Sequence, residues 1–344
     1  MKKDIPISLW DQFYRLANEL AALAPWDWML DVDLFGVVDP DTGEVNYCGI
    51  LGAGGRPKGL AMLRGSKGLF SFERMLDQEP EYFQLLESYQ LDGVILTFQN
   101  LSSLSSLELN LLTSTGFYPE GMLEAPILKD HTPGFVPWKI DDPALLQRFL
   151  VTLDQGLQLA KNFRQDPDLL DYTGAHEKRI LVRIPERDAS ETLIWKNDWM
   201  PEPSYLSEIE APEINRIFLR SNCSDLPRLP EEWTTDLFYF PQPIHTDEER
   251  PHLPQMAILA IKEKGAIIGR AKFQQGEVAQ GIEQLFLDTA KRAGGLPKKL
   301  IATRPESFAI WQPLANSLSI DIQLRTDELL MEEIKIRLIN SMLG

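Results

Sequence analysis

Cysteine and long apolar runs are scarce in this sequence, and each scarcity excludes a class of protein. The two cysteines, Cys48 and Cys223, are too few and too far apart for a disulfide framework, so reduced thiols in a cytoplasm are expected. No stretch approaches the run of about 18 apolar residues that a membrane span needs. The opening residues lack the apolar core of a secretory signal. We therefore expect a cytoplasmic protein without a membrane partner.

The signatures of common catalytic and cofactor sites are also missing. His245 and His252 lie seven positions apart in a proline-rich segment without helical geometry, which does not suit a zinc site, and no Gly-x-Ser-x-Gly motif occurs. The glycine-rich residues 52–59 lack the Gly-Lys-Ser/Thr of a phosphate loop and lead into a predicted strand rather than a helix. We therefore expect no cofactor. A divalent metal ion stays an alternative, because two groups of carboxylates in the sequence could bind one.

Basic side chains are fewer than acidic ones in this sequence. The chain of 344 residues has 34 basic and 51 acidic side chains, a net charge of −17. Such an excess opposes association with a phosphate backbone, so nucleic acid is not the expected partner. The hydrophobic fraction of 44% is ordinary for a globular protein, and the length suits two domains of roughly 150 residues each.

The pattern of residues 1–200 predicts an α+β domain with a mainly antiparallel sheet. A first helix is expected from Ser8, with Ser8 and Asp11 as a capping box, and a long helix after Asp142. Alternating apolar residues around a Pro/Gly turn predict a hairpin over 34–51. The proline-containing residues 119–140 are expected to be irregular. Further strands are expected at 59–63, 94–98, 179–184 and 192–195.

Residues 201–233 are expected to be a proline-rich acidic connection to a second domain. Residues 202–249 carry eleven acidic and three basic side chains, although 217–219 is strand-like. Residues 234–344 then alternate between strands and helices, which predicts an α/β domain with a mixed sheet. Its strands are expected at 236–240, 256–261, 266–273, 300–303 and 320–324, and its last helix at 327–342.

The element order of this second domain, βββαβαβα, resembles that of ribonuclease H-like folds. The resemblance implies carboxylates on the first strand, the first helix and the end of the fourth strand, where they bind two metal ions. The nearest residues are Asp236, Glu283 and Glu306, which become candidate catalytic residues. Two features depart from the pattern, because Asp236 begins its predicted strand and Glu306 follows Pro305.

A second candidate metal site lies in the first domain. Asp31 and Asp33 would point to the same face of a strand, where two carboxylates can hold a divalent cation. As a calcium loop the segment fails, because Thr42 occupies the position of the bidentate glutamate. The alternative is structural: the two carboxylates cap turns or pair with basic residues such as Arg56 or Arg64.

Basic and aromatic side chains supply two further candidate binding features. Residues 262–304 hold nine basic and four acidic side chains, which form either a basic patch for an acidic partner or a counterpart to the preceding acidic stretch. The candidate patch residues are Lys262, Lys264, Arg270, Lys272, Lys298 and Lys299. Trp26, Trp28 and Trp138 lie at loop junctions, where they either form a binding groove or pack the loops onto the core.

Four segments together resemble an uncharacterised two-module bacterial family of unknown function. They are residues 24–29 (APWDWM), 31–37 (DVDLFGV), 43–48 (GEVNYC) and 133–138 (PGFVPW), and the last 90 residues are similar to a second module that often accompanies the first. The resemblance implies no activity. We expect a non-catalytic binding or protein-interaction module with a protein partner still to be identified. A divalent-metal-dependent enzyme acting on phosphoesters or nucleic acid is the open alternative.

Overall fold

A computed structural model describes residues 4–55, 57–77, 81–117, 123–245, 250–274, 276–326 and 329–343. The chain divides into two compact units, and both are discontinuous in sequence. Unit 1 contains residues 1–77, 91–132 and 137–203, and unit 2 contains residues 78–90, 133–136 and 204–344. The domain limits expected from the sequence stay a prediction. No helix within the described ranges is long and apolar enough to cross a membrane.

Unit 1 is built on an eight-stranded sheet with the order β6-β5-β4-β3-β2-β1-β7-β8. Every neighbouring pair in it is antiparallel except β1 and β7, so the predicted α+β domain with a mainly antiparallel sheet is confirmed. The strands are β1 (Phe35–Val38), β2 (Val45–Leu51), β3 (Gly59–Arg64), β4 (Gly93–Asn100), β5 (Glu124–His131), β6 (Trp138–Lys139), β7 (Arg179–Arg187) and β8 (Leu193–Pro201).

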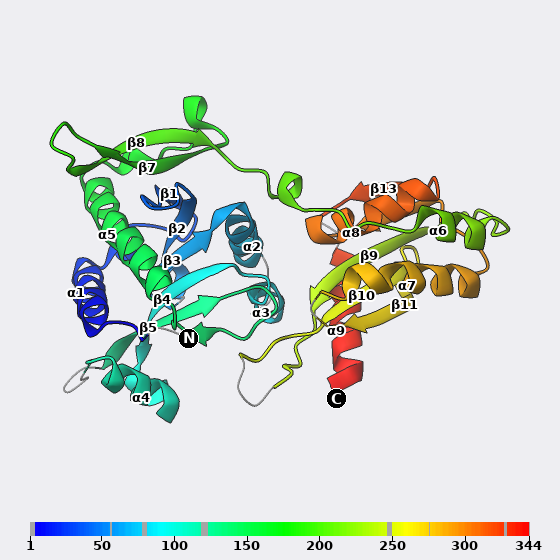
Figure 1. Ribbon diagram of the computed structural model, residues 1–344, viewed down its shortest axis with the longest axis horizontal. Helices are drawn as coiled ribbons and strands as arrows, with labels where there is room; N and C mark the ends of the chain where they lie inside the picture. Colours follow the sequence, from blue (N-terminus) through cyan, green and yellow to red (C-terminus); the bar gives the residue numbers. More distant parts are fainter. Residues whose placement is uncertain are drawn as a thin grey trace. The chain divides into compact units, whose positions relative to one another are not determined.

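Helices cover both faces of this sheet. Helices α1 (Ile7–Leu23) and α5 (Pro143–Gln165) pack side by side on one face, as Figure 1 shows, and α2 (Gly65–Asp77) packs against β2 and β3. The short helix α4 (Ser106–Ser114) precedes β5 in the chain. One apolar cluster joins α1 and α5 to the sheet, and it includes Phe13, Cys48 and Phe149. Burial of apolar side chains of this kind is the main favourable contribution to folding.

Two expectations for unit 1 are wrong. Helix α1 begins at Ile7, one residue before Ser8, and its N-cap is Pro6 without a side-chain hydrogen bond, so the predicted capping box does not form. A capping box exists instead at α4, where Ser105 and Glu108 bond each other's backbone. The described part of the crossing at 119–140 contains the strand β5, which runs through Pro126.

Unit 2 is built on a five-stranded mixed sheet with the order β11-β10-β9-β12-β13. Strands β9, β12 and β13 are parallel to one another, whereas β10 is antiparallel to both β9 and β11. The predicted α/β domain with a mixed sheet is therefore confirmed, and the likeness to ribonuclease H-like folds stays a prediction. The strands are β9 (Glu232–Tyr239), β10 (Gln255–Ile261), β11 (Ala266–Phe273), β12 (Lys299–Ala302) and β13 (Asp321–Leu324).

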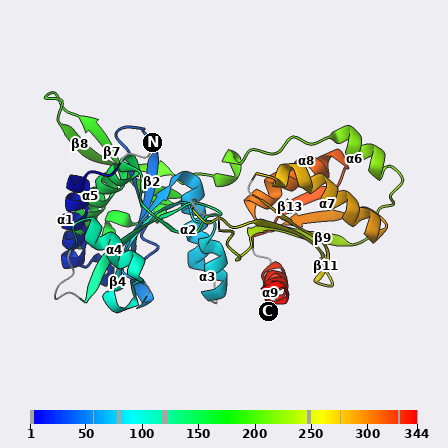
Figure 2. The same cartoon turned by 60° about the horizontal axis from the view of Figure 1, so that its bottom comes forward.

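The helices of unit 2 form two layers around its sheet. Helices α7 (Val278–Ala293) and α8 (Pro305–Ser317) lie on one side and α9 (Leu329–Leu343) on the other, as Figure 2 shows. The predicted first residue of α9, Asp327, lies outside the described residues. The strand-like residues 217–219 belong to a helix instead, α6 (Arg216–Cys223), whose N-cap is Asn215.

A helix from the first third of the chain completes unit 2. Helix α3 (Glu81–Ser88) belongs to this unit, and Leu86 packs in the same buried cluster as Phe238 of β9 and Ile334 of α9. The segment 133–136 also belongs to it, because Gly134 accepts a hydrogen bond from the backbone of Leu253. The chain therefore passes between the two units several times.

Candidate functional site

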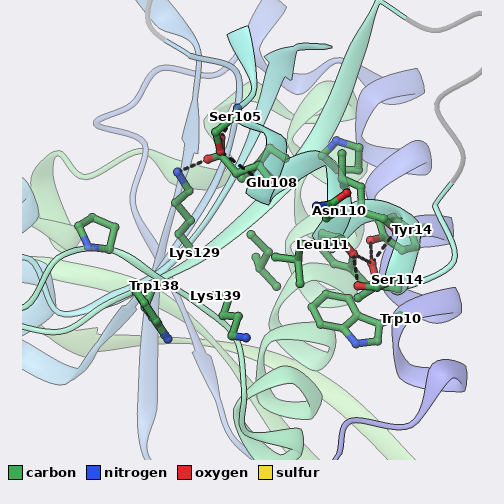
Figure 3. A pocket seen from close by; sticks show the side chains of 17 residues that line it. Trp10, Tyr14, Ser105, Glu108, Asn110, Leu111, Ser114, Lys129, Trp138 and Lys139 are labelled. Carbon is green, nitrogen blue, oxygen red and sulfur yellow. Dashed lines mark hydrogen bonds and ion pairs between the residues drawn. The ribbon is translucent and has the colours of Figure 1, made fainter. Parts of the chain in front are cut away.

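A cleft of about 560 Å³ opens in unit 1 between α1, α4, the edge strand β6 and its neighbour β5 (Figure 3). Its apolar lining comes from elements that are far apart in the sequence, so only the folded chain assembles it. The main apolar lining residues are Trp10, Phe13, Tyr14, Leu111, Leu112, Ile127, Leu128, Pro137 and Trp138. Ligand sites in proteins have volumes of roughly 300 to 1,000 Å³ and linings of this apolar kind.

Aromatic packing fixes the α1 wall of the cleft. The rings of Trp10 and Phe13 meet edge to face with centroids 5.7 Å apart, and Tyr14 packs on Phe117 at 4.8 Å. The hydroxyl groups of Tyr14 and Thr115 are hydrogen-bonded to each other, which ties α1 to the end of α4. Burial, partly offset by this hydrogen bond, raises the pKa of Tyr14, so its hydroxyl stays protonated at neutral pH. The wall is therefore preorganised.

The charged pair of Lys129 and Glu108 lies at one side of the cleft, apart from Asn110, Tyr14 and Ser114, as Figure 3 shows. Lys129 donates a hydrogen bond of 2.7 Å to Glu108, whose other carboxylate oxygen caps the start of α4 at Ser105. The hydrogen bond from Lys129 is the largest effect on Glu108 and outweighs its burial, so the pKa of Glu108 is lowered to about 2. Lys139 lies opposite Lys129 on β6, and no ion pair involves it within the described residues.

The three candidate tryptophans do not come together. Trp138 lines the cleft, whereas neither Trp26 nor Trp28 is among its lining residues. The ring of Trp26 packs on Phe98, with centroids 5.7 Å apart. The ring of Trp28 lies under the guanidinium of Arg164 at 4.6 Å. A binding role for Trp26 and Trp28 therefore stays a prediction, and in the structure both rings pack loops onto the core.

Asp31 and Asp33 lie in a turn before β1 rather than on a strand. Asp31 is buried, and its Oδ1 accepts hydrogen bonds from the backbone N–H groups of Gly52 and Ala53 at 3.1 and 3.0 Å. Asp33 accepts a hydrogen bond of 2.7 Å from the backbone of Leu30. Both carboxylates therefore fix loops. Among the residues that the structure describes, no group of three or more His, Cys, Asp or Glu side chains is placed to hold a metal ion.

The three candidate carboxylates of the second domain, Asp236, Glu283 and Glu306, do not form one cluster. Asp236 lies in the middle of β9, not at its start as expected, and is fully buried. Glu306 is the second residue of α8, directly after Pro305. Glu283 lies elsewhere on α7, where it accepts a hydrogen bond of 2.7 Å from the backbone of Asn215. The structure therefore does not bring Glu283 together with Asp236.

Two cations occupy the surroundings of Asp236 instead. The ammonium of Lys335 lies 2.9 Å from Asp236, and the Nε of Arg304 lies 3.4 Å from it. Arg304 also forms a bidentate pair with Glu87 of α3, one of whose hydrogen bonds is 3.0 Å long. Burial lowers the pKa of Arg304, but the charges of Glu87 and Asp236 outweigh burial and raise it. Because Lys and Arg cannot be metal ligands while charged, this arrangement does not fit a two-metal site.

The six candidate residues of the basic patch have different surroundings, and their role as a patch stays a prediction. Lys262 and Lys299 both lie near Glu232, at 4.0 and 3.7 Å, so part of the basic stretch does pair with the acidic one. Lys272 donates a hydrogen bond to Gln242. Within the described residues, Lys264 and Lys298 take part in no ion pair. Arg270 faces a separate groove on unit 2.

Sequence reasoning missed most of the cleft. Trp10 and Phe13 belong to the apolar face of α1, where their spacing indicates only a helix packed on a core. Leu111 lies on α4 and Lys129 lies on β5. Their positions beside each other depend on β5, a strand that the sequence pattern does not predict. The one available signal was Trp138, a large aromatic residue within a proline-rich segment.

In comparisons with known proteins, two parts of the chain match models of domain families. The model of the Domain of unknown function (DUF7309) matches residues 10–183, and the model of the Domain of unknown function (DUF6930) matches residues 220–339. No curated protein and no solved structure matches the chain. The expected family with two modules of unknown function is therefore confirmed, and all residues that line the cleft lie within the first match.

Proposed function

We propose that this chain, which belongs to the family Domain of unknown function (DUF7309), is a binding module whose cleft holds a small, largely apolar ligand. The observation that carries the proposal is the cleft itself, with its volume of about 560 Å³ between α1, α4, β5 and β6. The proposal is a sharper form of the binding module expected from the sequence.

The lining supports affinity for an apolar body. Burial of apolar ligand surface is favourable by about 25 cal/mol for each Å² removed from water. A preformed wall also reduces the ordering that binding would otherwise cost. The aromatic contacts of Trp10, Phe13 and Tyr14 supply such a wall on one side.

The polar groups of the cleft support orientation of a ligand rather than catalysis. Glu108 and Lys129 are engaged with each other, and Glu108 also caps α4. A general acid or base needs a pKa near the working pH, whereas the pKa of Glu108 is about 2. The alternative of a metal-dependent enzyme has less support. Asp31 accepts a hydrogen bond from the backbone of a loop, and Asp236 forms ion pairs with Lys335 and Arg304.

The test is a fluorescence titration of the full chain with N-phenyl-1-naphthylamine, a neutral apolar dye whose emission rises in apolar surroundings. We expect saturable binding by the unaltered protein. Leu111→Trp adds bulk to the lining, and we expect it to weaken binding by at least about tenfold, because the larger side chain fills space that the dye needs. Trp138→Ala removes an aromatic wall and should weaken binding as well.

Two matched variants control for unspecific effects. Leu123→Trp makes the same substitution at an exposed position outside the cleft, and Trp28→Phe alters a tryptophan that does not line it. Both should leave the dye affinity unchanged. If the unaltered protein does not bind the dye, or if Leu111→Trp and Leu123→Trp bind equally well, the proposed function is wrong.

A further inference from the structure

Unit 2 carries a second cavity, a groove of about 250 Å³ between the edge strand β11 and the helix α9. Two arginines, Arg270 of β11 and Arg337 of α9, line this groove together with Ile267, Leu338 and Ser341. None of these residues takes part in the cleft of unit 1. The groove is therefore a separate candidate binding site.

A β-bulge aims Arg270 into the groove. The register between β10 and β11 shifts between Leu259 and Ala260, which leaves Ile268 as an extra residue in β11. In a regular strand, Ile267 and Arg270 would point to opposite faces of the sheet, because they are three positions apart. The extra residue brings both to the same face. Bulges of this kind re-aim side chains and are frequent beside functional sites.

That shared face is the one that α9 covers. Arg270 lies opposite Ile258, which packs with Leu338 of α9 in one buried cluster. Arg337 lines the groove from the helix, near the turn before β11. A Cβ atom added at Gly265, in the turn before β11, would lie 3.3 Å from a terminal nitrogen of Arg337. Two arginines from different elements therefore line one groove.

Neither guanidinium is neutralised within the part of the chain that the structure describes. No ion pair of Arg270 or Arg337 occurs there, and no acidic side chain lines the groove. The Nε of Arg337 makes only a long hydrogen bond of 3.4 Å to the carbonyl of Glu333, so its terminal nitrogens remain available. Two cationic side chains without an acidic partner in the same groove favour the binding of an anion there.

We propose that this groove binds a small organic dianion, either a phosphate monoester or a dicarboxylate. Guanidinium groups present paired N–H donors that match the paired oxygens of phosphate and carboxylate groups. The apolar side chains of Ile267 and Leu338 provide a surface for the organic part of the ligand. The volume of the groove suits a small molecule rather than a polymer.

Calorimetric titration of the full chain with phenyl phosphate, and separately with phthalate, tests this site. We expect saturable binding of at least one of the two dianions, with phenyl phosphate reporting the phosphate class and phthalate the dicarboxylate class. Arg270→Met and Arg337→Met should each weaken that binding by about tenfold or more, because each removes charge-assisted hydrogen bonds. Arg270→Lys should retain part of the affinity, since it keeps the charge without the paired donors.

Lys298→Met is the matched control, because it removes the same charge from an exposed lysine of unit 2 that does not line the groove. It should leave the affinity within about twofold of the unaltered protein, since exposed charges are screened by salt. Absence of binding at millimolar concentration of both dianions would overturn the proposal. So would an equal loss in Lys298→Met and Arg270→Met, or binding of a single-stranded oligonucleotide at these arginines without binding of either small dianion.

Discussion

The substitution Glu87→Gln tests how α3 is held on the second sheet. The side chains of Glu87 and Arg304 are each only 2% exposed, and they form a bidentate pair although they are 217 positions apart. Replacing the carboxylate with an amide removes one negative charge and leaves the guanidinium buried. Because removing one partner of a buried ion pair is far more costly than breaking a surface pair, a large loss of stability is expected.

The size of the loss follows from what remains around Arg304. Breaking a buried pair costs about 3–5 kcal/mol when the surviving charge has no other partner. Arg304 keeps Asp236 at 3.4 Å, so we place Glu87→Gln at the lower end, about 3 kcal/mol. The assay is urea-induced unfolding at pH 7, followed by circular dichroism and extrapolated to zero denaturant.

Glu19→Gln provides the matched control. Glu19 forms an exposed pair of 2.6 Å with Arg15 on α1, at a spacing of one helical turn. Exposed pairs of this kind contribute about 0.3–0.5 kcal/mol, so the same substitution there should change stability by no more than that. If Glu87→Gln costs as little as Glu19→Gln, the buried pair is not formed and the account of α3 is refuted.

Two further predictions concern unit 1. Gly59→Ala should destabilise the protein by about 3 kcal/mol in the same assay, because the new Cβ would lie 1.9 Å from the carbonyl oxygen of Leu96; unchanged stability would contradict that approach of β3 to β4. Burial, together with the nearby charges of Glu202 and Asp77, raises the pKa of Glu73 to about 7 from 4.5. The folded state therefore binds the proton more tightly, so the contribution of Glu73 to stability falls as pH rises from 4.5 to 7. Glu73→Gln should raise the melting temperature at pH 8 and not at pH 4; an equal effect at both values would contradict this.

Strands with regular alternation could be predicted from the sequence, whereas β5 could not. The hairpin of β1 and β2 follows from alternating apolar residues around a turn with Gly43. Strand β5, with the sequence EAPILKDH, has proline and charged residues that hide the alternation. Its neighbour β4 supplies the hydrogen bonds that make it a strand, and such a partner is invisible to local patterns.

Long-range pairing also limited what could be predicted about the sites. The element order of the second domain makes Asp236 a candidate, but its partners Arg304 and Lys335 come from distant elements. The bulge that places Arg270 beside α9 depends on the register of β11 against β10. In the first unit, Trp138 was identified, but the opposite wall of the cleft comes from α1.

The measurement that tests the central claim most directly is photoaffinity labelling of the full chain with an apolar diazirine probe, followed by peptide mass spectrometry. The account predicts that labels concentrate on peptides that contain Trp10–Tyr14, 105–115 and 126–139, the three segments that line the cleft. Leu111→Trp should reduce those labels and leave labelling elsewhere unchanged. Labels spread evenly over the surface, or concentrated on unit 2, would contradict the proposed binding module.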